Sequence, residues 1–524
     1  MERDPGRSTF LADQLAGSAD RYCFGVCLIF IEPERDRLVI AVFSEQLKKE
    51  RWKDRRVLVV GAARQGLSLV KYLVKHGADV VLNDARPSNE FVDLESELMI
   101  STQNSSGTLS FVFGSHPLEL LDRIDLVCVS GGVPLDIPLI TEAERQGISL
   151  SNDSQIFLEA APSQTIGITG SAGKTTTTTL VGRFAVESNK YRQVWVGGNI
   201  GSPLLSNLDE MGANDLAVME LSSFQLEIMD RSPTVAAVLN ITPNHLDRHR
   251  TMQAYTNAKR HILEYQSSDE VAILNRDDPG SWALARDVRG KLVSFGLSEL
   301  PDDQSGTYIA HDHLYFRWAD QPSILLMHKS DISLRGQHNL QNILAAGAIA
   351  TASGMNPEAV RAGVKDFRGV SHRLEFVRRW GGADWFNDSI ATAPERVLAA
   401  IDSFNEPIIL LAGGRDKNLP WDDFARQVEQ RVDHLVVFGE AADKILAAIH
   451  DATANSSNQL EGRIRKTPLT IFKCSTMAEA VQEAAKIVEP GDVVLLSPGG
   501  TSFDEFHDFE ERGECFVKLV SELP

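Results

Sequence analysis

A lysine and two threonines follow a glycine-containing turn, and together they could hold the phosphates of a nucleotide. The stretch Thr165–Thr169 is rich in β-branched residues, the turn Gly170–Gly173 follows it, and Lys174, Thr175 and Thr176 begin a helix-compatible segment. Exposed N–H groups and the positive end of a helix dipole favour phosphate at such a helix N-terminus. In loops of this kind the lysine reaches the β- and γ-phosphates, and the first hydroxyl binds Mg²⁺. The sequence therefore predicts a strand, a phosphate-binding loop and a helix in succession.

The spacing of this loop departs from the common nucleoside-triphosphate pattern. That pattern places a glycine five residues before the glycine that precedes the lysine, and this chain has Ile168 there. A glycine turn that precedes a helix without binding a ligand is therefore the alternative interpretation.

Polar side chains also end two further predicted strands. Glu220 lies near the end of the stretch 216–221, and His245 follows the stretch 235–239. The carboxyl ends of strands in an open α/β sheet are where ligands bind, so the pair could handle a metal and a phosphate. A metal ligand and a loop histidine without a ligand are equally good interpretations of His245. Lys259 falls on a predicted helix, and by its position alone it is an ordinary solvent-facing lysine.

An earlier strand–turn–helix segment carries a degraded dinucleotide fingerprint. Gly61 and Gly66 match the pattern G-x-G-x-x-G, whereas Ala63 replaces its middle glycine. Asp84 follows the next predicted strand, where a Rossmann enzyme holds a ribose. A dinucleotide, a nucleotide sugar and a turn without any ligand are all compatible with this segment.

Composition limits the classes of partner. The 524 residues include 52 basic and 72 acidic side chains, which give a formal net charge of −20. Such a charge argues against broad nucleic-acid binding, and no nucleic-acid partner is expected. The five irregularly spaced cysteines predict neither a disulfide framework nor a zinc site, which fits a reducing cytoplasm. The longest apolar run has about ten residues and a membrane helix needs roughly 18, so no membrane insertion is expected.

The length suits about three domains, and the alternation of predicted strands and helices is typical of α/β folds. We predict an N-terminal extension of unknown role at residues 1–53 and a nucleotide-type substrate domain at 54–155. A central ATP-binding domain follows at 156–369, and a C-terminal α/β domain at 370–524.

Several motifs, in the same order along the chain, resemble those of the Mur ligases, the ATP-dependent amide-forming enzymes of peptidoglycan precursor synthesis. The stretches that carry the resemblance are Thr169–Thr176, Gly197–Gly201, Glu220–Glu227, Leu239–Arg248, Gly336–Asn339, Ser371–Glu375, Asn387–Thr392 and Ser502–Phe506. Those that begin at Glu220 and Ser502 point to the branch that adds D-glutamate to UDP-N-acetylmuramoyl-L-alanine.

The resemblance implies a fold and a reaction. The fold is a Rossmann-like N-terminal domain for the UDP part of the substrate, a central P-loop ATPase domain and a Rossmann-like C-terminal domain for glutamate. In the reaction, ATP phosphorylates the substrate carboxylate, and the glutamate amine then attacks the acyl phosphate. Two Mg²⁺ ions and a carbamate formed by CO₂ on Lys259 are also implied. We expect a cytoplasmic monomer whose partners are UDP-N-acetylmuramoyl-L-alanine, glutamate and ATP.

The resemblance also implies roles for residues at positions that match the family motifs. The expected catalytic residues are Lys174, Glu220, His245 and Lys259. The expected ATP contacts are Gly170, Ser171, Ala172, Gly173, Lys174, Thr175, Thr176, Asn339, Arg373 and Asp388. The expected Mg²⁺ ligands are Thr175, Glu220, His245 and carbamylated Lys259. The expected contacts to the UDP-linked substrate are Asp84, Arg86, Asn199, Ser222 and Gln225. The expected contacts to glutamate are Thr392, Lys417, Ser502 and the backbone of Phe509.

The chain departs from the family pattern at Ala63, Gly131, Ala172 and Ile390. Ile390 stands where a lysine is common, so a positive charge near the two substrates is missing and the choice between D- and L-glutamate is left open. The alternatives are an L-glutamate-adding or folate-related amide ligase, a non-catalytic nucleotide-binding protein, and a dehydrogenase. The combined retention of Lys174, Glu220, His245 and Lys259 argues against a protein that only binds nucleotide.

Overall fold

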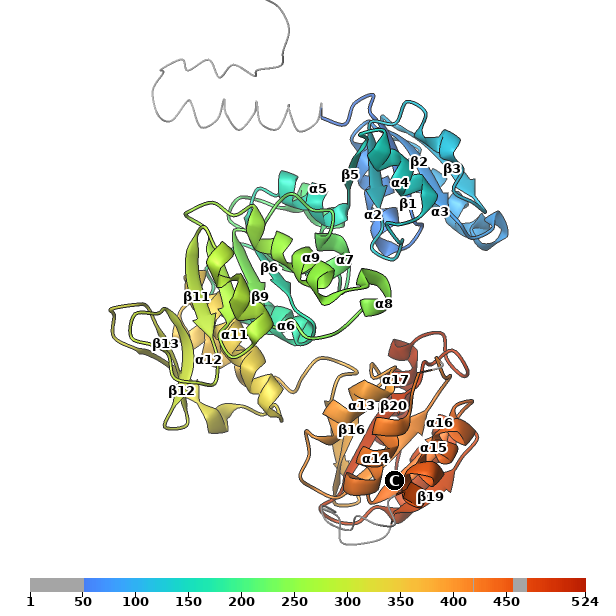
Figure 1. Cartoon of the computed structure of the whole chain (residues 1–524), viewed down its shortest axis with the longest axis vertical. Coiled ribbons are helices and arrows are strands. Elements are labelled where there is room, and N and C mark those ends of the chain that lie inside the picture. The colour runs from blue at the N-terminus through green and yellow to red at the C-terminus, as the bar shows by residue number, and fades with distance from the viewer. Residues whose placement is uncertain (1–50, 418, 456–468) are drawn as a thin grey trace, which may run out of the picture. The chain divides into compact units, whose positions relative to one another are not determined.

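A computed structural model describes residues 51–417, 419–455 and 469–524 (Figure 1). The predicted N-terminal extension lies outside the described residues except for 51–53. The described residues form three sheets that are wholly or mostly parallel, and the predicted class of three α/β domains is confirmed. The boundaries at residues 155 and 369 stay predictions.

The first sheet has five parallel strands in the order β3-β2-β1-β4-β5. Its strands are β1 (Arg56–Val60), β2 (Asp79–Asp84), β3 (Thr108–Phe113), β4 (Leu126–Val129) and β5 (Ser149–Ser151). Its helices are α2 (Arg64–Lys75), α3 (Val92–Thr102) and α4 (Pro138–Arg145), and α5 (Asp153–Ala160) follows β5. Val57 and Val59 pack under α2 and α3, whereas Leu58 and Val60 pack under α4. Because helices cover both faces, β1 is apolar at every buried position.

The central sheet has nine strands in the order β14-β13-β12-β11-β10-β9-β6-β8-β7. They are β6 (Gln164–Thr169), β7 (Val194–Gly198), β8 (Leu216–Glu220), β9 (Val235–Val238), β10 (Val271–Asn275), β11 (Lys291–Phe295), β12 (Gly306–Ala310), β13 (His313–Arg317) and β14 (Ile324–His328). The pairs from β7 through β12 are parallel, and β13 and β14 add an antiparallel edge.

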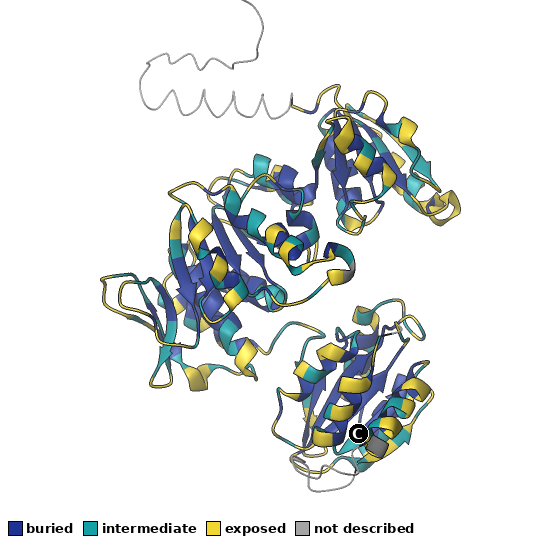
Figure 2. Cartoon of the chain, in the orientation of Figure 1, coloured by how far each residue is buried: buried dark blue, intermediate teal, exposed yellow. Residues whose placement is uncertain are grey.

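Helices cover both faces of the central sheet, and its strands β8, β9 and β10 are buried at every residue (Figure 2). The helices of this part of the chain are α6 (Lys174–Glu187), α7 (Ser223–Leu226), α8 (Leu246–His249), α9 (Met252–Glu264), α10 (Pro279–Trp282), α11 (Gln337–Ala352) and α12 (Pro357–Val364). Side chains of α6, α11 and α12 form one apolar core with the strands, and α9 packs on the opposite face.

The third sheet has six strands in the order β15-β16-β20-β17-β18-β19, with only β15 antiparallel. The strands are β15 (Glu375–Trp380), β16 (Ala383–Asn387), β17 (Ile408–Gly413), β18 (His434–Phe438), β19 (Thr470–Lys473) and β20 (Val493–Gly499). The helices are α13 (Pro394–Ile401), α14 (Asp422–Arg431), α15 (Ala442–Asn455), α16 (Met477–Ile487) and α17 (Phe509–Ser521). The first three cover one face of the sheet, and α16 and α17 cover the other.

Short 3₁₀ segments complete the described elements: η1 (Ser88–Glu90), η2 (Leu118–Leu121), η3 (Leu204–Glu210), η4 (Ala283–Asp287) and η5 (Lys329–Asp331). Within the described ranges, no helix is both long enough and apolar enough to cross a bilayer.

Candidate active site

The phosphate loop lies at the point where the central sheet changes its winding direction. β6 sits between β8 and β9, with Ile168 paired with Glu220 on one side and Thr169 with Val238 on the other. The loops that leave these strands therefore diverge and leave a crevice at their carboxyl ends, which is where open α/β sheets bind ligands. The fold thus places the loop after β6 and the carboxylate at the end of β8 side by side.

Asn240, just beyond β9, holds the phosphate loop in shape. Its Oδ1 accepts a hydrogen bond from the backbone N–H of Ala172 at 2.8 Å, and its backbone carbonyl accepts one from the N–H of Ser171 at 3.0 Å. The Lys174 ammonium folds back to donate to the carbonyl of Gly170 at 2.9 Å. These hydrogen bonds therefore preorganise the loop and hold the Lys174 ammonium against its backbone.

Gly173 is the residue that allows this loop to enter α6. It precedes the helix with a φ of 81°, a left-handed conformation that disfavours side chains. A Cβ at this position would also lie 2.2 Å from Oδ1 of Asn342.

We expect Gly173→Ala to lower the free energy of unfolding of the central domain by about 1–2 kcal/mol from backbone conformation alone, and to weaken nucleotide binding. Thermal unfolding and titration with a fluorescent ATP analogue measure the two effects. Gly212→Ala is the matched control, because its Cβ would meet only ordinary contacts of 3.6 Å or more. Equal behaviour of the two variants would contradict the prediction.

Glu220 forms the acidic centre of the site. The side chain is buried, and its two oxygens accept hydrogen bonds from the Thr175 hydroxyl at 2.8 Å and from the Asn199 amide at 2.9 Å. A carboxylate beside a hydroxyl offers the oxygen ligands that Mg²⁺ prefers. These residues therefore fit the metal that the sequence predicted here. The predicted participation of His245 and Lys259 in the metal site stays a prediction.

Lys259 is buried against the phosphate loop, not exposed to solvent as its position on a helix suggested. Only 1% of the residue is exposed, and its ammonium donates to the carbonyl of Gly170 at 3.0 Å and to the Thr169 hydroxyl at 3.3 Å. Burial, together with the charge of Lys174, lowers the pKa of Lys259 well below its ordinary value, although Glu220 acts in the opposite direction. Both effects favour the neutral form of this amine over its charged form.

The segment after β9 is arranged around an aromatic ring. His245 is exposed, has a φ of 54° and meets the ring of Phe224 edge-on at 5.0 Å between centroids. The guanidinium of Arg248 lies 4.0 Å from the centroid of the same ring and donates to the carbonyl of Gly131. His245 therefore packs against Phe224 of α7, and Arg248 links this segment to the loop after β4.

Ser222 and Gln225 form a capping box at the start of α7. The Ser222 hydroxyl accepts from the backbone N–H of Gln225, and the Gln225 side chain accepts from the backbone N–H of Ser222. The amide of Gln225 also donates to the Ser154 hydroxyl at 2.8 Å. Both side chains thus already stabilise the local backbone, and any contact to substrate would be additional.

Asp84 at the end of β2 binds the protein's own backbone and Arg86. It accepts from the N–H of Ala62 at 2.8 Å and, through both oxygens, from the Arg86 guanidinium at 3.0 Å. Burial alone would raise the pKa of Asp84, but these hydrogen bonds outweigh it and lower the pKa to about 2. The guanidinium of Arg86 also lies 4.6 Å from the ring centroid of Phe91. The pair therefore forms a charged, aromatic-backed corner beside the glycine turn of Gly61.

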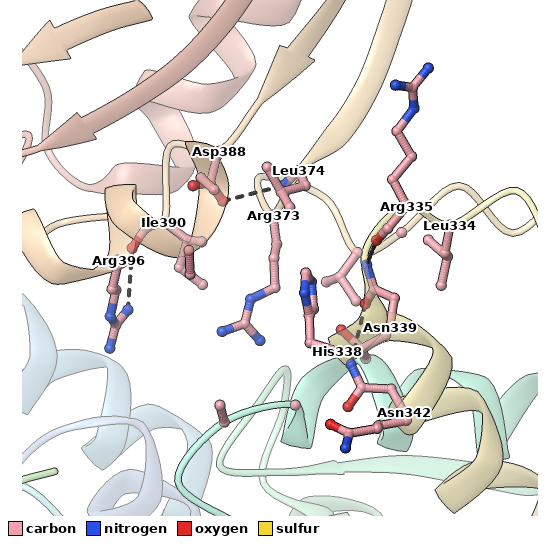
Figure 3. A pocket seen from close by; sticks show the side chains of 18 of the residues that line it. Leu334, Arg335, His338, Asn339, Asn342, Arg373, Leu374, Asp388, Ile390 and Arg396 are labelled. Carbon is pink, nitrogen blue, oxygen red and sulfur yellow. Dashed lines mark hydrogen bonds between the residues drawn. The ribbon is translucent and has the colours of Figure 1, made fainter. Parts of the chain in front are cut away.

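A cavity of about 690 Å³ joins the phosphate loop to residues of the third sheet (Figure 3). It is lined in part by Asn339 of α11, Arg373 and Asp388, and Figure 3 shows the Arg373 side chain extending into it. Burial raises the pKa of Asp388 to about 7, against the opposing hydrogen bond from Ser497 and the charge of Arg373. The volume suits a small-molecule ligand.

Three of the residues predicted to contact glutamate, Thr392, Lys417 and Ser502, follow strands of the third sheet, and Phe509 begins α17. The ammonium of Lys417 is 3.5 Å from the Thr392 hydroxyl. Ser502 is buried, and the backbone carbonyl of Phe509 accepts a hydrogen bond from the Ser389 hydroxyl at 2.8 Å. The structure therefore brings Lys417 and Thr392 together.

Three further cavity residues escaped the sequence reasoning: His338, Asn342 and Arg396. The first two lie in or beside a quoted motif at the start of α11, which was a usable signal. Arg396 sits on α13 with no motif around it, so only the structure identifies it.

The matches to protein-family models follow the three sheets. Residues 55–152 match a model for the Mur ligase MurD-like N-terminal domain, residues 168–350 match the Mur ligase middle domain, and residues 372–500 match the Mur ligase glutamate ligase domain.

Curated relatives match over most of the chain. A UDP-N-acetylmuramoylalanine–D-glutamate ligase of Acetivibrio thermocellus is 36% identical over 475 residues, which are 91% of this chain and 98% of the relative. A ligase of the same name from Symbiobacterium thermophilum is 38% identical over 468 residues, 89% of this chain and 98% of the relative.

Solved structures share the fold at low sequence identity. The UDP-N-acetylmuramate-alanine ligase of Thermotoga maritima has a TM-score of 0.52 and 17% identity, and the match covers 89% of this chain and 99% of that one. MurF of Acinetobacter baumannii has a TM-score of 0.52 and 19% identity, over 90% of this chain and 92% of that one.

Proposed function

The chain belongs to the Mur ligase family, and from this premise we propose that it adds D-glutamate to UDP-N-acetylmuramoyl-L-alanine with conversion of ATP to ADP and phosphate. The observation that carries the proposal is the convergence of Lys174, Thr175, Glu220 and Lys259 at the carboxyl ends of β6 and β8. A protein that only binds nucleotide has no need of a buried carboxylate and a second buried lysine beside its phosphate loop.

The reaction solves a simple chemical problem, because a carboxylate is a poor acyl donor. The terminal carboxylate oxygen of the UDP-linked substrate attacks the γ-phosphorus of ATP, and the bond to ADP breaks. The glutamate amine then attacks the carbonyl carbon of this acyl phosphate. The tetrahedral intermediate loses inorganic phosphate, the nitrogen loses a proton, and an amide remains.

The chain's own residues stabilise charge during phosphoryl transfer. Lys174 donates a hydrogen bond to the Gly170 carbonyl of the loop, and we propose that it contacts the β- and γ-phosphates when ATP binds. Thr175 and Glu220 are the residues that would hold Mg²⁺, which when bound neutralises charge on the phosphates. Asn199 keeps the Glu220 carboxylate oriented through its hydrogen bond to Oε1.

Lys259 is proposed to work as a carbamate. Its lowered pKa favours the neutral amine, which is the form whose nitrogen attacks the carbon of CO₂ and then releases a proton. The product is anionic, so it exchanges the repulsion with Lys174 for an attraction. With Glu220 and His245, its oxygens would help to hold a second Mg²⁺, whose positive charge would offset that of the phosphates.

We propose that each of the three domains binds one of the substrates. The corner formed by Asp84 and Arg86 is proposed to bind the uracil end of the UDP-linked substrate. Asn339, Arg373 and Asp388 are proposed to contact ATP in the cavity. Lys417 and Thr392, with Ser502 and the Phe509 backbone, are proposed to bind glutamate. We further propose that the protein acts in the cytoplasm, which supplies ATP and UDP-sugars, and that it is a monomer.

Purified protein is expected to release phosphate only when ATP, Mg²⁺, UDP-N-acetylmuramoyl-L-alanine and D-glutamate are all present. Phosphate release and the mass of the UDP-linked product are the measurements. L-glutamate serves as the matched control and is expected to give little product.

Two outcomes would change the proposal in different ways. Phosphate release with neither isomer would contradict the ligase assignment itself. Release with L-glutamate alone would leave the ligase assignment in place and overturn the choice of amino acid, which the isoleucine at position 390 makes worth testing.

A further inference from the structure

The guanidinium of Arg396 lies at the cavity, next to the backbone of Ile390. Arg396 is on α13, its side chain is accessible to solvent, and it lines the cavity together with Ile390. Its Nη1 donates to the backbone carbonyl of Ile390 at 3.3 Å (Figure 3). Within residues 51–417, 419–455 and 469–524, Arg396 takes part in no ion pair shorter than 4.0 Å.

The positive charges of Arg396 and Lys417 act on each other. Loss of surrounding water, and next the charge of Arg396, lower the pKa of Lys417, although Glu395 acts in the opposite direction. For Arg396 the loss of water and the charge of Arg373 lower the pKa, while Glu395 and Asp388 oppose them. Like charges gathered around one opening are unfavourable unless an anion joins them. The arrangement therefore favours a ligand with more than one negative charge.

Glutamate has two carboxylates, and Lys417 with Thr392 supplies a cation and a hydroxyl for one of them. The isoleucine at position 390 contributes no charge. Arg396 is six residues further along the chain, but its hydrogen bond to the Ile390 carbonyl holds the guanidinium beside this position. A guanidinium can bind a carboxylate through two parallel hydrogen bonds, which an ammonium cannot do.

We propose that Arg396 binds the second carboxylate of the incoming glutamate and so selects a dicarboxylic amino acid. This inference rests on the proposed function, because it assigns a residue to the amino-acid substrate of that reaction. Arg396 is a substrate-binding and specificity-determining residue in this view, and it takes no part in phosphoryl transfer.

The test compares steady-state constants of the full chain and its variants for each substrate separately. Arg396→Met is expected to raise the KM for glutamate about 100-fold, as the loss of one partner of a charged pair does, and to leave the KM for ATP within about twofold. It should also reduce the preference for glutamate over glutamine, which lacks the second charge. Arg396→Lys keeps the charge and should raise the KM for glutamate by no more than about tenfold.

A lysine introduced at position 390 tests whether a nearby positive charge restores glutamate binding. The double variant Ile390→Lys with Arg396→Met is expected to recover at least about tenfold of the lost glutamate affinity. Arg426→Met is the matched control, because Arg426 is an exposed arginine on α14 whose ion-pair partner is Asp423 of the same helix. It should leave all KM values unchanged.

Three results would overturn the inference. They are an unchanged KM for glutamate in Arg396→Met, an equal rise in the KM for ATP, and failure of the lysine at position 390 to rescue. A wild-type protein that releases no phosphate with either glutamate isomer would instead contradict the proposed function, so the two failures are distinguishable.

Discussion

Replacement of Lys174 by methionine is expected to reduce the rate of phosphate release about 1,000-fold at saturating substrate, because removal of a charged clamp on a transferring phosphoryl group has effects of this size. The Lys174 ammonium donates to the Gly170 carbonyl at the mouth of the phosphate loop, so it needs only a short movement to reach the phosphates. Methionine keeps most of the side-chain volume and removes the charge. Phosphate release measures the rate, and a fluorescent ATP analogue measures binding.

Lys291→Met is the matched control, because Lys291 is an exposed lysine of the same sheet, in β11. It should keep the wild-type rate. If Lys174→Met kept more than a tenth of the wild-type rate, the phosphate loop would not be the site of phosphoryl transfer.

Lys259→Ala is expected to lose activity at least about 100-fold, since it removes the group that is proposed to become an anionic, metal-binding carbamate. The reason is structural: the amine is buried against Gly170 and close enough to Lys174 for its pKa to fall well below the ordinary value. Added acetate or another short carboxylate should restore part of the activity, because it can occupy the space that the side chain leaves and supply the missing negative charge. Phosphate release, with and without acetate, is the measurement.

Two further variants separate the carbamate from a purely structural role. Lys259→Met fills the same space, so it should fold normally in a thermal melt, remain inactive and gain nothing from acetate. Gln253→Ala changes an exposed residue of the same helix and should be fully active. In wild-type protein, ¹³C-labelled CO₂ should give a carbonyl resonance that Lys259→Met lacks. Full activity of Lys259→Ala would refute the carbamate.

The sequence predicted the parts of the site that are contiguous. The strand, loop and helix around Lys174 follow from local rules: β-branched residues extend the chain, glycine allows the left-handed turn at Gly173, and the helix begins with its N–H groups exposed. The class of the fold followed from the alternation of strands and helices. The antiparallel strands β13 and β14 were not predicted, although β13 alternates the buried Leu314 and Phe316 with half-buried neighbours, which is typical of a strand with one covered face.

Burial changed the interpretation of Lys259 and added detail to that of Asp84. On a helix diagram Lys259 is an ordinary surface lysine, but α9 turns it inward against the phosphate loop. Asp84 ends β2, where a Rossmann enzyme binds a ribose, and the structure shows that it also accepts hydrogen bonds from Ala62 and Arg86. Side-chain orientation depends on which face of an element is covered, and a single sequence does not contain that information.

The sequence by itself determined the phosphate loop, the α/β class and the resemblance to the Mur ligases, because each depends on residues that are neighbours in the chain. Only the tertiary structure brought Thr175 against Glu220, 45 positions away, since that contact depends on the order of β6 and β8 in the sheet. Only the tertiary structure likewise lowered the pKa of Lys259 and placed Arg396 beside Ile390. The lowered pKa of Lys259 and the position of Arg396 both depend on packing between segments that are distant in the chain, because that packing excludes water and brings charged groups together.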